Sequence, residues 1–171
     1  MTPEELGDTL ARLVWESFSD FVADGDAEIP LGALGVPSQN GFPEQRATEE
    51  ALIFLMWAHT RGVQLAFFGR TQDSLVKRGL DAMHRAVFED LTGNGTPRSQ
   101  LPIFEQRISA RYTEYHAAAA CSDSRLGEAV MRHLRSQDCD EGKRLASAVS
   151  RRAIAVANPL RDFLEEVDLV G

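Results

Sequence analysis

The chain has 171 residues, of which 43% are hydrophobic and 26% charged, and it carries a net charge of −8 at pH 7. These values are ordinary for a globular protein, and a chain of this length buries enough surface to need no disulfide or metal staple. A pI near 5.0, with no basic stripe interleaved with aromatic residues, excludes nucleic acid from the expected partners. The length predicts a single domain over residues 1–171. The first ten residues are acidic where a targeting peptide would be basic, so we expect a cytoplasmic protein.

The negative charge is concentrated near the N-terminus. Residues 1–50 hold 11 Asp and Glu but only 2 Lys and Arg, whereas residues 51–171 hold 15 acidic and 16 basic residues. This asymmetry is typical of a solvated acidic helix and loop, and also of an acidic arm that docks on a basic partner.

The first predicted helix runs from the N-terminus to about residue 23. The letters TPEE form a capping box, in which Thr2 caps the helix, Glu5 reaches back, and Pro3 suits the first helical position. Residues 24–43 follow, with four Gly and three Pro, and this composition rules out a long regular element. We expect an irregular segment whose apolar residues pack along the surface.

The second predicted helix covers residues 44–68 and ends before Gly69. Its unbroken apolar run, Ala51 to Ala58, is only 8 residues long, whereas a membrane span needs about 20. We therefore expect no transmembrane segment. Read at 3.6 residues per turn, the helix is apolar around most of its circumference, which is typical of a central helix with neighbours on several sides.

Further helices are predicted over about 71–91, 100–120, 124–136 and from Asp138 with Glu141 onward. Thr71 and Ser99 are the expected N-caps of the first two of these, and Pro102 is tolerated in a first helical turn. A break or a kink is expected at Asn158-Pro159, where Asn158 can cap a last helix. No strand pattern of period two persists for more than a few residues. The predicted fold is an all-α bundle of six or seven helices, with helix 44–68 central.

No motif of catalysis or metal binding is visible. G-x-S-x-G, Walker and G-x-G-x-x-G motifs are absent, so nothing demands an enzyme, although none is excluded. The two cysteines, Cys121 and Cys139, flank a predicted helix about 21 Å long, too far apart for a disulfide. The four histidines fall on four different predicted helices without a Glu-x-x-His pair, so we expect neither a metal nor a cofactor: His59, His84, His116 and His133.

Two polar pairs are the candidate binding residues. His59 and Arg61 interrupt the apolar second helix, either as internally paired groups or as the lining of a pocket between helices. We expect His59 to be buried and neutral. Arg111 and Tyr115 follow Arg107 at helical spacing, which indicates either a packing edge or a ligand or partner surface.

Four segments occur in order over about residues 50–152: MWAHTRG, AVFEDL, ISARYTEYHAAAA and SRLGEAVMRHL. Their order resembles that of the ubiquinol–cytochrome c chaperone family, whose members are all-helical assembly factors acting on newly made cytochrome b. The resemblance implies a non-enzymatic client-binding protein near a membrane surface, and it transfers no catalytic residue to this chain.

Two functions from different classes are therefore open. The first is a non-enzymatic, chaperone-like protein that binds a polypeptide partner and self-associates, with peripheral membrane contact allowed. The alternative is a small-molecule binding protein or enzyme that holds an anionic ligand in an interhelical pocket near His59 and Arg61, because an Arg beside a His suits an anion.

Overall fold

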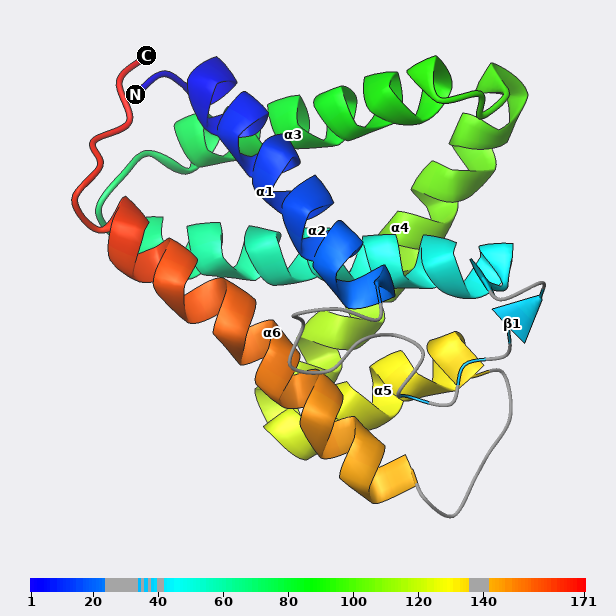
Figure 1. Cartoon of the computed structure of the whole chain (residues 1–171). Coiled ribbons are helices and arrows are strands. Elements are labelled where there is room, and N and C mark those ends of the chain that lie inside the picture. The colour runs from blue at the N-terminus through cyan, green and yellow to red at the C-terminus, as the bar shows by residue number, and fades with distance from the viewer. Residues whose placement is uncertain (24–33, 35, 37, 40–41, 136–141) are drawn as a thin grey trace.

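The computed structural model describes residues 1–23, 34, 36, 38–39, 42–135 and 142–171. Over these residues the chain forms six α-helices: α1 (Pro3–Val22), α2 (Gln45–Phe67), α3 (Asp73–Gly93), α4 (Leu101–Cys121), α5 (Asp123–Arg135) and α6 (Gly142–Leu164). A short 3₁₀ helix, η2 (Arg98–Gln100), precedes α4. Two residues of β1 (Ser38–Gln39) pair antiparallel with β2 (Phe42–Pro43), with Ser38 opposite Pro43. The predicted all-α class is confirmed (Figure 1).

Several sequence predictions lie outside the described residues. They include most of the irregular segment 24–43, the position of Cys139, and the expected start of the sixth helix at Asp138 with Glu141. Within the described part of the chain, none of the helices combines the length and the apolar content that crossing a bilayer requires.

The ends of the first two helices follow local rules. The Thr2 hydroxyl accepts from the Glu5 backbone N–H at 3.2 Å, and the Glu5 carboxylate accepts from the Thr2 N–H at 2.8 Å, so the predicted capping box is confirmed. Gly69 follows α2 with a φ of +69°, a left-handed conformation that a residue without Cβ adopts at little cost.

Two predicted caps are wrong. The helix α3 begins after Gln72 rather than Thr71, and α4 begins after Gln100 rather than Ser99, which lies inside η2. Neither observed cap residue makes a side-chain cap hydrogen bond. A capping bond contributes only about 1 kcal/mol, so tertiary packing can move a helix start by a residue or two.

At Asn158-Pro159 the sequence predicts a break or a kink, and the break is wrong, because α6 continues through Pro159 to Leu164. Proline within a helix costs about 3 kcal/mol. Here the residues on both sides of it are held against α2: Ala157 lies so close to Gly62 that an added Cβ there would meet the Ala157 carbonyl at 3.0 Å, and Leu160 is buried. Burial of this helix face offsets the lost backbone hydrogen bond.

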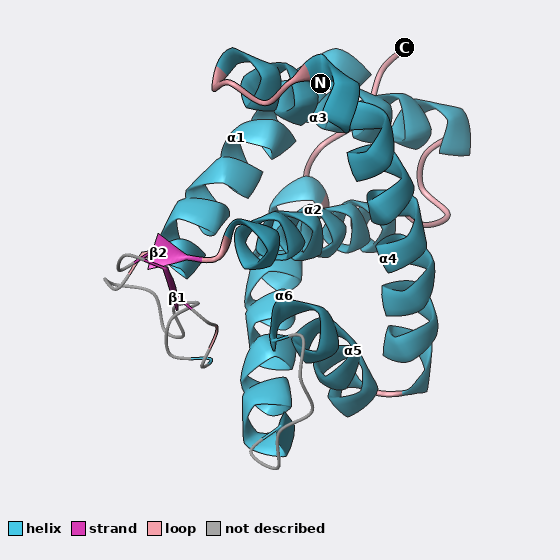
Figure 2. Cartoon of the chain, turned by 90° about the vertical axis from the view of Figure 1, so that its right-hand side faces the viewer, coloured by secondary structure: helices cyan, strands magenta, loops and turns pink. Residues whose placement is uncertain are grey.

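The helix α2 lies at the centre of the bundle, as expected from its apolar circumference. It packs against each of the other five α-helices, and every residue from Ala51 to Thr60 is buried. Figure 2 shows α2 nearly end-on, with the other helices around it. Its side chains contribute to two apolar clusters, one shared with α1, α4, α5 and α6 and the other with α1, α3, α4 and α6.

Candidate functional site

The polar pair on α2 is divided between two sides of the helix. Residues two apart on an α-helix point in nearly opposite directions, and His59 lines a cleft that Arg61 does not line. The Arg61 guanidinium instead lies over the Trp57 ring, 5.9 Å from its centroid. Burial, and secondarily the charge of Arg61, lower the pKa of the nearby His116. The structure therefore does not bring His59 and Arg61 together.

His59 is buried, with only 3% of its surface exposed. Its Nδ1 lies 2.8 Å from the carbonyl oxygen of Leu55 one turn earlier, and this oxygen can only accept, so Nδ1 carries the proton. Burial lowers the pKa of the imidazole to about 4. At neutral pH the ring is thus uncharged, and Nε2 presents a lone pair for which no hydrogen bond is found among the described residues.

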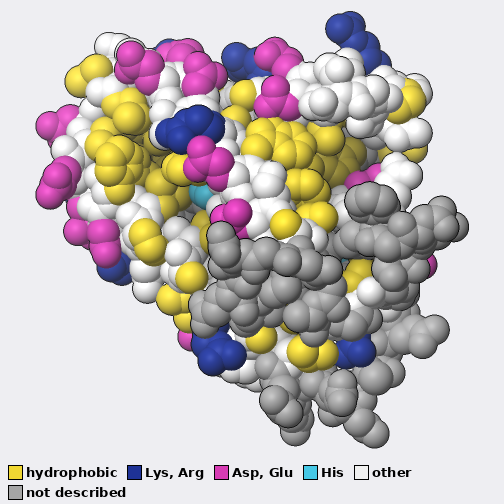
Figure 3. Space-filling model, in the orientation of Figure 1, with side chains coloured by type: hydrophobic (Ala, Val, Ile, Leu, Met, Phe, Trp, Pro, Cys, Tyr) yellow, Lys and Arg dark blue, Asp and Glu magenta, His cyan; other side chains and the backbone are white. Residues whose placement is uncertain are grey.

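The lone pair of His59 belongs to the floor of a cleft between α1 and α6. Both helices pack against α2, but their own backbones approach each other closely at few points. The cleft has a volume of about 460 Å³. Its walls are Thr9, Arg12, Leu13 and Ser17 from α1 and Arg152, Ala155, Val156, Pro159, Leu160 and Phe163 from α6. Figure 3 shows a small histidine surface in a recess of this face, with apolar side chains beside it.

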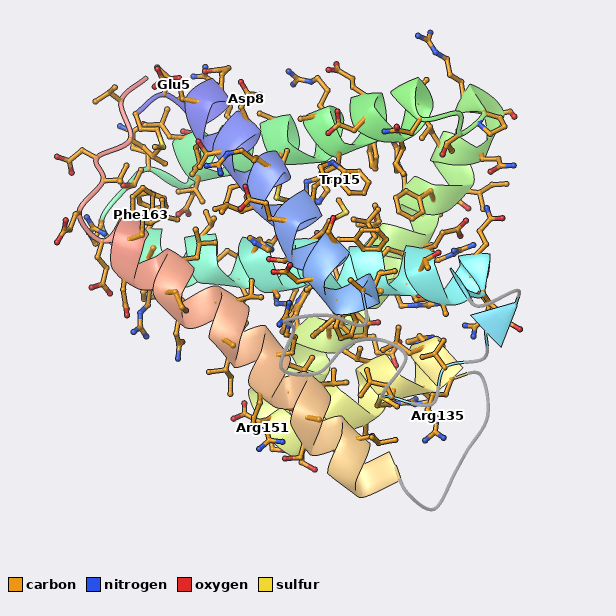
Figure 4. All side chains as sticks on the ribbon, viewed as in Figure 1. Glu5, Asp8, Trp15, Arg135, Arg151 and Phe163 are labelled. Carbon is orange, nitrogen blue, oxygen red and sulfur yellow. The ribbon has the colours of Figure 1, made fainter. Side chains whose placement is uncertain are left out.

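The two ends of this cleft differ. At one end Arg152 reaches α1, where its guanidinium donates to the Ser17 carbonyl at 3.4 Å, and its Nε is buried without a partner among the described residues. At the other end Phe163 is 54% exposed and stands near the C-terminal end of α6 (Figure 4). Along the rim, Arg12 pairs with Glu16 at 2.8 Å. The cleft is therefore cationic at one end and apolar at the other.

Arg111 belongs to a different place, the interface between α4 and α2. Its Nε and NH2 groups donate to the two carboxylate oxygens of Glu50, both at 2.9 Å, and Glu50 is only 3% exposed. Beside them Arg107 donates to Glu49 at 2.6 Å. Sequence reasoning missed Glu50; the available signal was a carboxylate directly before the apolar run that begins at Ala51. Both arginines are internally paired, which agrees with the packing-edge interpretation.

Tyr115 is buried in the core beside this ion pair. Its ring packs edge-on against Phe54 and Trp57, with centroids 6.4 Å and 5.8 Å away. Burial, with a smaller contribution from the negative charge of Glu50, raises the pKa of its phenol. The hydroxyl has no hydrogen-bond partner among the described residues, and neither has the Trp57 Nε1. The side chain is thus placed as a core residue, without access to a surface ligand.

A second polar network was not foreseen from the sequence. The Tyr112 hydroxyl lies 3.0 Å from Nε2 of His84 and 3.4 Å from the Thr60 hydroxyl, while Nδ1 of His84 donates to the Leu80 carbonyl at 2.7 Å. Burial lowers the pKa of His84, so its Nε2 is unprotonated and accepts a hydrogen bond from the Tyr112 hydroxyl. Each member of this chain has a partner, which indicates a structural role between α2, α3 and α4.

A second cleft, of about 440 Å³, lies where α2, α3 and the start of α4 meet. Its charged side chains, Glu49 and Arg107, are already bonded to each other, whereas the α1–α6 cleft presents polar atoms that lack partners. A shallower groove between α1 and α3 carries acidic residues, and there the Trp15 indole donates to Asp90 at 2.7 Å. Of these three hollows, the α1–α6 cleft is the strongest candidate site.

In the part of the chain that the structure describes, no three His, Cys, Asp or Glu side chains are grouped to hold a metal ion. Comparisons with protein-family models, with curated proteins and with solved structures found no match to this chain. The resemblance to the ubiquinol–cytochrome c chaperone family therefore stays a prediction.

Proposed function

We propose that the protein is a non-enzymatic binding protein that holds a small amphipathic molecule in the α1–α6 cleft. The observation that carries this proposal is the unpartnered Nε2 of the buried His59 at the floor of an open, mostly apolar hollow. Small-molecule sites are typically concave, have volumes of about 300–1,000 Å³ and combine apolar walls with few polar groups. A cleft of about 460 Å³ with one buried imidazole at its floor has this character.

The cleft follows from how three helices meet. A ligand with an apolar body would cover Leu13 on α1 and Val156 on α6, which the two helices do not cover for each other. Burial of such surface contributes about 25 cal/mol per Å² removed from water. Among the described residues no hydrogen bond joins a hydroxyl group of the cleft, on Thr9 or Ser17, to the His59 imidazole, so the proposal includes no reaction.

A polypeptide partner is the second candidate. It is favoured by large apolar side chains at the surface, of which Phe68 is 87% exposed and Ile103 62% exposed. Such residues are common anchors of protein interfaces when they gather in one patch. Phe68 follows the last residue of α2 and Ile103 lies in the first turn of α4, so the two side chains do not belong to one element. For this reason we place the cleft first.

The test uses the neutral, environment-sensitive dye Nile red as a probe of the cleft. Ala155 is exposed and lines the cleft, so Ala155→Trp should fill it without disturbing the core. The matched control is Ala117→Trp, at an exposed position of α4 away from the cleft. We expect saturable fluorescence enhancement with wild type and with Ala117→Trp, and its loss with Ala155→Trp at an unchanged melting temperature. Equal binding by all three proteins would place the dye elsewhere and overturn the proposal.

A further inference from the structure

We infer that the α1–α6 cleft takes a monocarboxylic acid with an unbranched apolar tail, its carboxyl group held at the Arg152 end beside His59 and its tail directed toward Phe163. This inference rests on the proposed function, because it names the chemistry of the ligand for the same cleft.

The carboxyl end is assigned by two polar groups that line the cleft. Nε2 of His59 has a lone pair for which no hydrogen bond is found among the described residues, and the cationic guanidinium of Arg152 lines the wall. A carboxyl group is complementary to both, because it can donate to a lone pair and accept from a cation. One protonated carboxyl group therefore suits this end: its carbonyl oxygen accepts from the Arg152 guanidinium, and its O–H donates to His59.

The tail direction is assigned by the walls. The α6 residues from Arg152 to Phe163 extend about 16 Å at about 1.5 Å per residue. Between these two ends the α6 wall is Ala155, Val156, Pro159 and Leu160, with no charged side chain among them. Phe163 stands exposed at the far end, and Figure 4 shows it at the C-terminal end of α6. An unbranched chain therefore finds apolar contacts along its α6 side, and Leu13 adds one from α1.

Proton uptake follows from this arrangement. A carboxylate anion beside the lone pair of a neutral imidazole would be repelled, so the pair must hold one proton in the complex. The charged groups that line the same cleft are both cations, Arg12 on α1 and Arg152 on α6, and Arg12 is already paired with Glu16. At neutral pH the unbound ligand is a carboxylate anion and the His59 side chain is a neutral imidazole. Formation of the complex therefore takes up one proton from solution. Affinity should therefore fall by up to about tenfold per pH unit between about pH 6 and pH 8.

The experiment is isothermal titration of the full-length protein with decanoate and with decanol, which share a tail and differ in the head group. Arg152→Gln removes the guanidinium donor. Its matched control is Arg151→Gln, since Figure 4 shows Arg151 on the side of α6 away from α1. We expect Arg152→Gln to weaken decanoate binding by about tenfold or more, as for other charge-assisted hydrogen bonds, and to leave decanol binding unchanged. Arg151→Gln should bind both compounds like wild type.

A second arm tests His59. Wild type should bind decanoate more weakly at about pH 8 than at about pH 6, with close to one proton taken up in buffers of different ionisation enthalpy. His59→Leu should remove this pH dependence while retaining decanol binding. If that variant fails to fold, the number of protons taken up by the wild-type protein on binding decanoate is by itself the test. Binding of decanol with no preference for decanoate, or decanoate binding that ignores Arg152→Gln or pH, would overturn the inference and leave the proposed function standing. Binding of neither compound would overturn both.

Discussion

The ion pair between Glu50 on α2 and Arg111 on α4 provides the sharpest stability test. Glu50→Ala removes a carboxylate that is 3% exposed and accepts two hydrogen bonds from Arg111, both at 2.9 Å. The guanidinium would be left in the interface without its partner. Removing one partner of a buried pair costs about 3–5 kcal/mol. Because the Arg111 side chain is 21% exposed and can recover some hydration, we expect the lower end, about 3 kcal/mol.

The free energy of unfolding is measured by urea denaturation followed by far-UV circular dichroism. Glu49→Ala is the matched control, since Glu49 is next in sequence, is 32% exposed and pairs with Arg107 at 2.6 Å; its loss should cost no more than about 1 kcal/mol. The double variant Glu50→Met with Arg111→Met replaces both charges by apolar groups and should recover most of the lost stability. A Glu50→Ala protein within about 1 kcal/mol of wild type, or no less stable than Glu49→Ala, would refute the reasoning.

Three further predictions concern single residues. The pKa of His59 falls from 6.5 to about 4 on folding, so the unfolded chain binds the proton more readily. The free energy of unfolding should therefore drop by about 3 kcal/mol as pH falls from about 6.5 to 4. An equally steep drop over the same pH range in His59→Leu would contradict this. Tyr115→Phe removes a buried hydroxyl without a partner and should raise the melting temperature or leave it unchanged, whereas a loss above about 1 kcal/mol would reveal a bonded hydroxyl. Gly127→Ala places a methyl group against the Ala146 carbonyl where α5 crosses α6, and it should lower the free energy of unfolding in urea by about 1–3 kcal/mol. Gly93→Ala is the control and should be tolerated, because there is open space around Gly93.

The sequence by itself determined the helices and the identity of the central one. The capping box at Thr2, the glycine after α2 and the apolar circumference of residues 44–68 are signals that act within a few residues of the backbone. Their physical basis is local, because they depend on hydrogen bonding and side-chain periodicity along one helix. The burial of His59 was predictable for the same reason, since its apolar neighbours one turn away share its face.

Only the tertiary structure decided which side chains meet. Glu50 and Arg111 are 61 residues apart in sequence, and no local pattern specifies that their helices cross at that point. The same holds for the cleft, which exists because α1 and α6 both pack on α2 while their backbones stay apart. It holds also for Pro159, where the helix continues because the residues beside the proline pack against Gly62. Helix crossing positions are set by the sum of many small contacts along whole faces. The positions at which helices cross therefore cannot be deduced from the pattern of any one helix.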